Sequence, residues 1–266
     1  MTRQELEEDN ADIHPSLNVI SIGIDSESKM IAIPGTNYRM GQTQVTQRLY
    51  KKVMRENPSW FQRSNDKLDD GQRNVLEDNT DNNPVENVSW FDAVCFCNML
   101  SILEGLTPAY SVSGETNPDY WNYTSFEVGM FEYSSFSIES EVYCDFDSNG
   151  YRLPTIDEWE EAARGGEDYR WSGSDYLDKV GWYKDNSGNV THPVAQKMAN
   201  SYGLYDMSGN VWEWVWEEAD PDFPDLRFFC GGSYSHPSAD CEVSFHLIDN
   251  ACLCHDMGFR LLRPMN

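Results

Sequence analysis

Apolar residues recur at helical spacing in three parts of the chain, and a side chain that favours helix N-termini precedes each part. In the second part, the apolar positions between residues 91 and 102 would form one stripe facing the core. In the third, Glu158 lies three residues after Thr155, which is the spacing of a capping box. The predicted helices run from N-cap Thr46 to before Pro58, from Ser89 to Gly105, and from Thr155 to Gly165.

A β-strand pattern is clearest where Trp212, Trp214 and Trp216 alternate with other residues and Glu213 separates the first two. A half-buried strand at this period would turn the indoles inward and the acids outward. Shorter strands are predicted at 30–33 and 228–229, a hairpin or two between 112 and 144, and a closing strand at 259–262. Residues 171–189 are predicted to form loops. Residues 235–257 show neither the helical nor the strand spacing of apolar residues. Short strands, about three helices and much irregular loop predict an α+β fold.

The composition excludes several classes of partner. The 266 residues include 19 Lys and Arg against 45 Asp and Glu, which gives a formal net charge of −26. Such a charge repels phosphate backbones and anionic membrane surfaces, so nucleic acid is not an expected partner, whereas cations and basic protein surfaces are favoured. Solubility alone is the other explanation of the charge. No apolar run reaches the roughly 20 residues of a membrane-spanning helix.

Seven cysteines are an odd number, so at least one of them is unpaired within the chain. Cys95 and Cys97 would point about 200° apart on a helix, which makes them core residues rather than ligands of one metal. Cys252 and Cys254 next to His255 have ligand types that zinc accepts, but a loop that happens to be rich in thiols explains them as well. Cysteine usage therefore leaves the redox compartment open.

Two acids in the segment before the tryptophan strand suggest a cation site. Asp206 and Glu213 flank a turn that contains Gly209, and glycine permits conformations that turn carbonyl groups inward. Two carboxylates with carbonyl oxygens are ligand types that calcium accepts. A core strand that follows a turn with solvated acids would have the same residues, so the pattern alone leaves both interpretations open.

Several of these segments together resemble the formylglycine-generating-enzyme domain, also called the sulfatase-modifying-factor domain. The resemblance covers about residues 30–263 and implies a C-type-lectin-like fold. Residues 1–28 are polar and acidic, which predicts an acidic lead or tether, and residues 29–266 are expected to form the domain. The motifs that carry the resemblance lie at 84–90, 151–155, 158–160, 203–214, 231–234 and 258–260.

The resemblance also bears on catalysis and calcium. The family's oxygenase binds copper through two cysteines, and the corresponding positions here are His236 and Cys241. One thiolate does not reproduce a two-sulfur copper site, so we expect a protein that is not an enzyme and needs no copper. The alternative is a metal-dependent oxidoreductase or regulatory domain that uses Cys241 together with His236. The family's second calcium site maps onto Asp206 and Glu213 as side-chain ligands and Gly209 and Val211 as carbonyl ligands.

Departures from the family pattern between about 230 and 257 resemble those of the variable proteins of diversity-generating retroelements, particularly spirochaete ones. The resemblance implies a surface-displayed binder of an unknown protein ligand on another cell or host. It also implies a monomer at the cell surface, lipid-anchored, with the export signal absent from this numbering; a cytoplasmic protein is the alternative. The candidate ligand-binding residues are Ser235, His236, Ser238, Asp240, Glu242, His246, Ile248, Asp249, Asn250, Cys252, Leu253, Cys254, His255 and Asp256.

Overall fold

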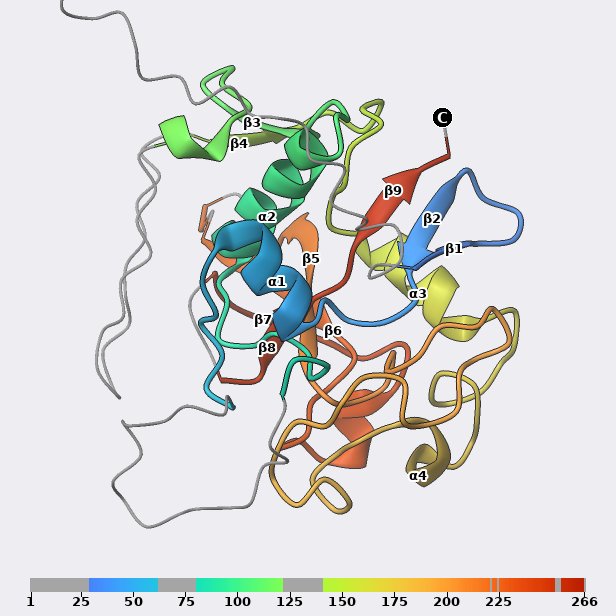
Figure 1. Ribbon diagram of the computed structural model, residues 1–266. Coiled ribbons are helices and arrows are strands. Elements are labelled where there is room, and N and C mark those ends of the chain that lie inside the picture. The colour runs from blue at the N-terminus through green and yellow to red at the C-terminus, as the bar shows by residue number, and fades with distance from the viewer. Residues whose placement is uncertain are drawn as a thin grey trace, which may run out of the picture.

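The computed structural model describes residues 29–61, 80–121, 141–220, 222–223, 225–251 and 255–265. Four α-helices occur in this part of the chain (Figure 1). None of the helices in the described ranges is long and apolar enough to cross a membrane. The helices are α1 (Gln47–Met54), α2 (Trp90–Leu103), α3 (Ile156–Arg164) and α4 (Leu177–Val180), with two short 3-10 turns, η2 (Pro118–Tyr120) and η3 (Ser238–Cys241).

The three predicted helices are confirmed together with their caps. The side chains of Thr46, Ser89 and Thr155 each accept a backbone hydrogen bond at a helix N-terminus. Thr155 and Glu158 form the predicted capping box. Helix α1 ends at Met54, followed by the left-handed C-cap residue Arg55, and does not extend to the later proline. A side-chain acceptor for the first free N–H groups therefore marks a helix start more sharply than proline marks its end.

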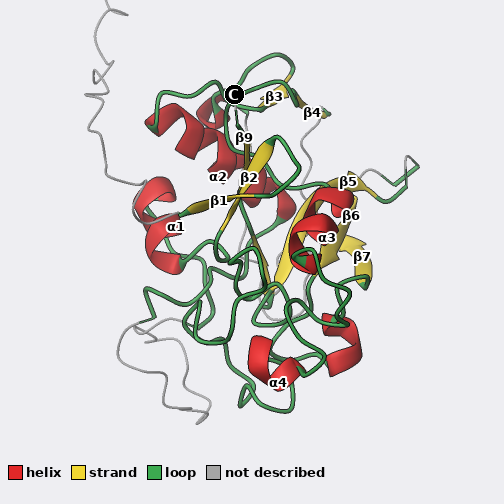
Figure 2. Cartoon of the chain, turned by 90° about the vertical axis from the view of Figure 1, so that its right-hand side faces the viewer, coloured by secondary structure: helices red, strands yellow, loops and turns green. Residues whose placement is uncertain are grey.

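Nine short strands in the described ranges form three small sheets, with α3 beside the sheet that contains β5 (Figure 2). One sheet has the order β1-β2-β9, one pairs β3 with β4, and the third has the order β7-β6-β5-β8. Within the third sheet, β5 and β8 are parallel and the other pairs are antiparallel. The strands are β1 (Met30–Ala32), β2 (Tyr38–Gly41), β3 (Tyr110–Val112), β4 (Val142–Cys144), β5 (Trp212–Glu218), β6 (Leu226–Cys230), β7 (His246–Asn250), β8 (Met257–Phe259) and β9 (Leu262–Pro264).

Four sequence-based expectations about these elements need correction. Helix α2 is buried on nearly all sides and has no single apolar stripe, because other elements cover both its faces. The expected closing strand is two strands, β8 and β9, in different sheets, since the chain leaves one sheet for the other after Phe259. A short helix, α4, lies within the predicted loop 171–180.

The fourth correction concerns residues 235–257, in which the apolar residues follow neither helical nor strand spacing. This segment contains η3 and the five-residue strand β7, which pairs along its whole length with β6. All five β7 residues are exposed, so no alternation of buried and exposed side chains existed for the sequence to reveal. The acidic lead at 1–28, most of the loop after residue 61, and Cys252, Leu253 and Cys254 lie outside the described residues.

Candidate functional site

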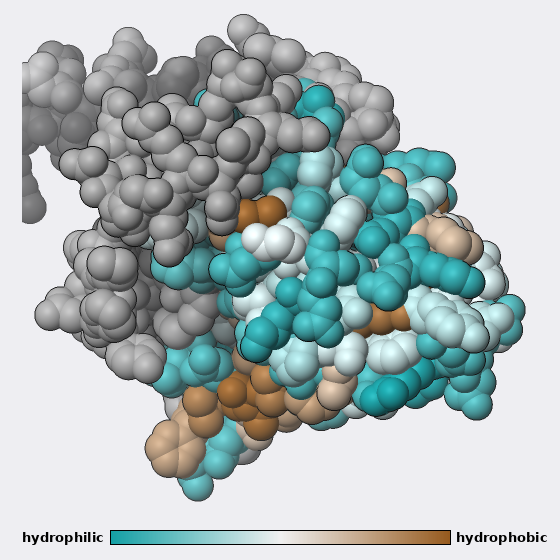
Figure 3. Space-filling view, turned by 90° about the horizontal axis from the view of Figure 1, so that it is seen from below, coloured by the Kyte–Doolittle hydropathy of each residue, from teal (hydrophilic) through white to brown (hydrophobic). Residues whose placement is uncertain are grey.

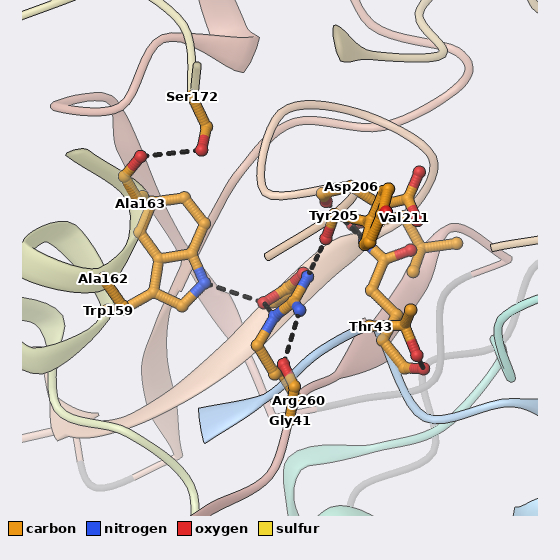
Figure 4. A network of polar contacts seen from close by, with 12 residues as sticks. Gly41, Thr43, Trp159, Ala162, Ala163, Ser172, Tyr205, Asp206, Val211 and Arg260 are labelled. Carbon is orange, nitrogen blue, oxygen red and sulfur yellow. Dashed lines mark hydrogen bonds and ion pairs between the residues drawn. The ribbon is translucent and has the colours of Figure 1, made fainter. Parts of the chain in front are cut away.

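Glu213 on β5 lies in the interior, which corrects the expectation that the acids of this strand face solvent. Its carboxylate accepts hydrogen bonds from Trp159 Nε1 (2.7 Å) and from Arg260 Nε (2.9 Å) and Nη2 (2.8 Å). The side chains of Arg260 and Glu213 are both fully buried. Arg260 also donates to the carbonyls of Gly41 and Tyr205, and the whole network is drawn in Figure 4. A buried pair of this kind is compatible with a core position because every charged group has several partners.

The carbonyl groups of the predicted calcium site do converge on one point, and the side chain of Gln44 reaches that point. Gln44 Nε2 donates to the carbonyl oxygens of Val211 (2.8 Å), Asp206 (3.2 Å) and Gly209 (3.2 Å). Gln44 is buried, although sequence analysis gave it no role. A hydrogen-bond donor therefore stands where the carbonyl ligands of a cation would meet.

The side-chain ligands predicted for calcium are also engaged. Both carboxylate oxygens of Glu213 have donors, as described above, and Asp206 Oδ2 accepts from Ala195 N at 2.7 Å. Only Asp206 Oδ1 and Gln44 Oε1 are buried acceptors of this cluster without a hydrogen-bond donor among the described residues. Burial raises the pKa of Asp206 to about 6. The residues as arranged do not fit a calcium ion. Calcium binding therefore stays a prediction, which a binding measurement has to test.

Cys241, the one cysteine at a family copper position, is a core residue. It is fully buried beside Leu177 and Val180, and burial raises the pKa of its thiol to about 12. A Cβ on Gly232 would collide with its sulfur, so Gly232 is required for this close packing. Within the described residues, no three His, Cys, Asp or Glu side chains are grouped so as to hold a metal ion. A protonated, enclosed thiol is a poor metal ligand and a poor nucleophile.

His236, at the other copper position, is part of a polar cluster around its Nδ1 atom. Ser233 Oγ (2.7 Å), Ser235 Oγ (3.1 Å) and Asp256 Oδ2 (3.2 Å) all approach this nitrogen. The hydrogen bond to Asp256 raises the pKa of His236. A catalytic relay needs its nucleophile and its carboxylate on opposite ring nitrogens. Because the serines and Asp256 share one nitrogen, this cluster is a hydrogen-bonded network and not a triad.

The candidate ligand-binding residues within the described ranges are all at least partly exposed. Buried residues between them, such as Cys241, Val243 and Ala251, anchor the segment in the protein. Glu242 is held by an ion pair with Arg170. Exposed apolar area comes from Leu247 and Ile248 on β7, which are 37% and 48% exposed. The exposed candidates are His246, Ile248, Asp249 and Asn250 on β7 together with His255, and those partly exposed are Ser235, His236, Ser238, Asp240, Glu242 and Asp256.

An aromatic platform beside these residues was missed by sequence analysis. The ring of Trp60, 39% exposed, lies 4.4 Å from the ring of His255. The backbone N–H groups of Trp60 and Phe61 donate to the two carboxylate oxygens of Glu86, at 3.0 and 2.9 Å. Phe61 in turn contacts Tyr234 edge to face. No local pattern could have revealed the platform, because its contacts connect residues far apart in the sequence.

Small sheets, four α-helices and long connections in the described part of the chain define an α+β, C-type-lectin-like protein. The face drawn in Figure 3 is mainly hydrophilic, with a smaller hydrophobic area at its lower edge. Residues 22–265 match the sequence profile of the sulfatase-modifying factor enzyme 1-like domain. The chain belongs to this family, which confirms the resemblance found in the motifs.

Similar proteins include members with different descriptions. The chain is 34% identical over 253 residues to the chaperone protein LppX of Paenibacillus barcinonensis, covering 86% of this chain and 80% of that one. The solved structure of Treponema denticola variable protein 1 superposes with a TM-score of 0.69 at 32% identity, covering 89% and 92% of the two chains. The mouse inactive C-alpha-formylglycine-generating enzyme 2 is 34% identical over 109 residues, which are 36% of this chain and 35% of that enzyme.

Proposed function

We propose that this protein binds a ligand without catalysis, through a diversified surface on the C-type-lectin-like scaffold. The observation that carries the proposal is that every described candidate residue is at least partly exposed, next to buried residues that fix the backbone. A rigid support lowers the entropy lost when a surface is ordered on binding. Similarity to Treponema denticola variable protein 1 supports diversification as the origin of these side chains.

The chemistry of the two copper positions supports a non-catalytic role. The thiol of Cys241 is enclosed and protonated, and His236 is committed to Asp256. The alternative, an oxidoreductase, would need the Cys241 thiol and the His236 ring to point toward one solvent-accessible metal position. Oxidation of a sulfatase-type cysteine peptide by the purified protein, with copper and oxygen present, would refute the proposal. We expect no product above a protein-free control.

Trp60 belongs to the proposed surface as an anchor that lies outside the diversified segment. Glu86 accepts from the peptide N–H groups on both sides of Trp60, those of Trp60 and Phe61, and Asn87 Nδ2 donates to Pro58 O at 3.0 Å. Tryptophan is enriched among the residues that dominate binding energy, particularly where its position is already fixed. A constant aromatic anchor beside variable positions would supply affinity while the variable positions set specificity.

The proposed ligand is a protein with a basic surface, and the proposed location is outside the cell. Charge supports the first proposal, because a net charge of −26 speeds the encounter with a cationic partner and repels an anionic one. We propose that the protein acts as a monomer at the cell surface, attached through a lipid. Light scattering of the purified protein and labelling of intact cells with a membrane-impermeant reagent test these two points.

Diversification itself is tested by sequencing the genomic locus. We expect a near-repeat of the codons for residues 230–260 beside a reverse-transcriptase gene. The repeat and the coding region should differ only at positions where the repeat has an adenine. The differing codons should be those of the exposed candidates and not those of Cys241 or Val243. Absence of a repeat, or differences concentrated in codons of buried residues, would contradict the proposal.

Binding can be tested with a phage library of random peptides panned on the immobilised protein. Enriched peptides should bind Trp60→Ala at least about fivefold more weakly, since loss of an anchor side chain typically costs more than about 1 kcal/mol. The control is Tyr143→Ala, which removes an aromatic ring that is 67% exposed on another sheet. Equal affinity for both variants would refute the role of Trp60, and failure to enrich any peptide would count against a binding surface.

A further inference from the structure

We propose that the amide of Gln44 replaces the cation at the centre of the 206–211 turn, so that this protein holds the turn without calcium. The proposal rests on the geometry of the turn and does not depend on the proposed ligand-binding function. Gln44 Nε2 lies within 3.2 Å of three carbonyl oxygens that belong to three different residues of the turn. The distances are those of N–H···O hydrogen bonds, whereas calcium holds its oxygens at 2.3–2.6 Å.

The turn needs a positive partner at its centre. Asp206 and Asn210 have φ angles of 57° and 66°, and Gly209 has a φ of 96°. These left-handed conformations turn the carbonyls of the turn toward one point, where their negative ends would repel each other. Only a donor group or a cation relieves that repulsion in the absence of water, and the Gln44 amide supplies the donor.

The chain fixes Gln44 in this position from both sides. Its neighbour Val45 donates a backbone hydrogen bond to Phe259 O at 3.0 Å, and Tyr205 N donates to Gln42 O at 2.9 Å. Gln44 therefore connects the segment after β2 with the turn before β5. The opposite orientation of its amide would place Oε1 against three carbonyl oxygens, which is unfavourable unless a cation is added.

The negative charge needed for a calcium ion is also used elsewhere. Glu213 pairs with Arg260, and neither side chain is exposed. Asp206 Oδ1 is then the one carboxylate oxygen of the predicted ligand set without a donor among the described residues. Conversion of the amide to a carboxylate, Gln44→Glu, would remove the donor and add oxygen ligands. This single change should create a site for calcium or a lanthanide ion.

Calcium itself is the probe for the test, on the full-length chain after removal of metal with a chelator. We expect the melting temperature of the wild type to be the same in chelator and in millimolar calcium, and calorimetry to detect no binding. Gln44→Glu should melt about 5 °C lower in chelator, because about 2 kcal/mol of lost hydrogen bonding corresponds to such a shift. Calcium should restore the loss, and bound terbium should luminesce when nearby tryptophans are excited.

Gln42→Glu is the matched control, since Gln42 donates to a single carbonyl, Gly203 O, in the same region. Its melting temperature should not respond to calcium. One calcium bound by the wild type, with a rise in melting temperature that Asp206→Asn abolishes, would overturn the proposal. Should Gln44→Glu fail to fold, the calorimetry of the wild type still decides between the two outcomes.

Discussion

Removal of one partner from the buried pair between Arg260 and Glu213 should be among the most destabilising single substitutions in this protein. Arg260→Met keeps most of the side-chain volume and removes the four hydrogen-bonding contacts that reach Glu213, Gly41 and Tyr205. The carboxylate of Glu213 would remain buried with one donor, Trp159 Nε1. The change therefore leaves an uncompensated charge and two carbonyl groups with lost partners.

The size of the stability loss caused by Arg260→Met follows from the burial of both Arg260 and Glu213. Breaking a buried ion pair by removing one partner costs about 3–5 kcal/mol, and unpaired carbonyl groups add to that. We expect a loss of about 5 kcal/mol in the free energy of unfolding, which is a large part of the roughly 5–15 kcal/mol available to a folded protein. At about 2–4 °C per kcal/mol, the melting temperature should fall by about 10–20 °C.

Urea unfolding followed by tryptophan fluorescence measures the loss directly. The control, Arg39→Met, removes an exposed arginine of β2 and should change stability by less than about 0.5 kcal/mol. The double variant Glu213→Gln, Arg260→Met should be more stable than Arg260→Met alone, because no buried charge is left. A loss below about 1 kcal/mol for Arg260→Met would refute the reasoning that this pair holds β5 to the chain after β8.

Three further predictions concern pH and packing. Burial raises the pKa of Glu86 to about 8 from 4.5, so the native state holds the proton more tightly than the unfolded state and stability should fall as pH rises through this window. In Glu86→Gln, the melting temperature should change less with pH than in the wild type. An equal change in both proteins between pH 5 and 8 would contradict this prediction. Asp256→Asn should lower the pKa of His236 in an NMR titration, because Asp256 is the main cause of its raised value, and no change would show that the pair is not formed. Gly232→Ala should cost several kcal/mol, whereas Gly114→Ala, at a similar positive φ in open space, should cost about 1 kcal/mol, and equal losses would exclude a packing role for Gly232.

Residues of three family motifs, Glu213, Arg260 and Trp159, form one buried network that joins the start of β5 to α3 and to the chain after β8. His236, in contrast, lies in a partly exposed hydrogen-bonded cluster, and Cys241 is a core contact. The buried network and the exposed segment therefore have different partners.

Local sequence signals determined three of the four described α-helices and the family of this protein. Most of the hairpin region predicted between 112 and 144 lies outside the described residues. Thr46, Ser89 and Thr155 satisfy free N–H groups within their own first turn, so each cap is visible in a few residues. The ordered motifs at 203–214 and 258–260 identified the family and its fold, because each motif is a short continuous segment that can be recognised in the sequence.

Only the tertiary structure decided the partners of each polar group. Glu213 looks like a solvated acid beside tryptophans, and its burial depends on Arg260, which lies 47 positions later. Gln44 carries no local signal, yet it meets the 206–211 turn from more than 160 positions away. Trp60 and His255 meet in the same manner. Sequence periodicity reports which side of an element is apolar, whereas the pairing of charges and hydrogen bonds depends on contacts that only the folded chain creates.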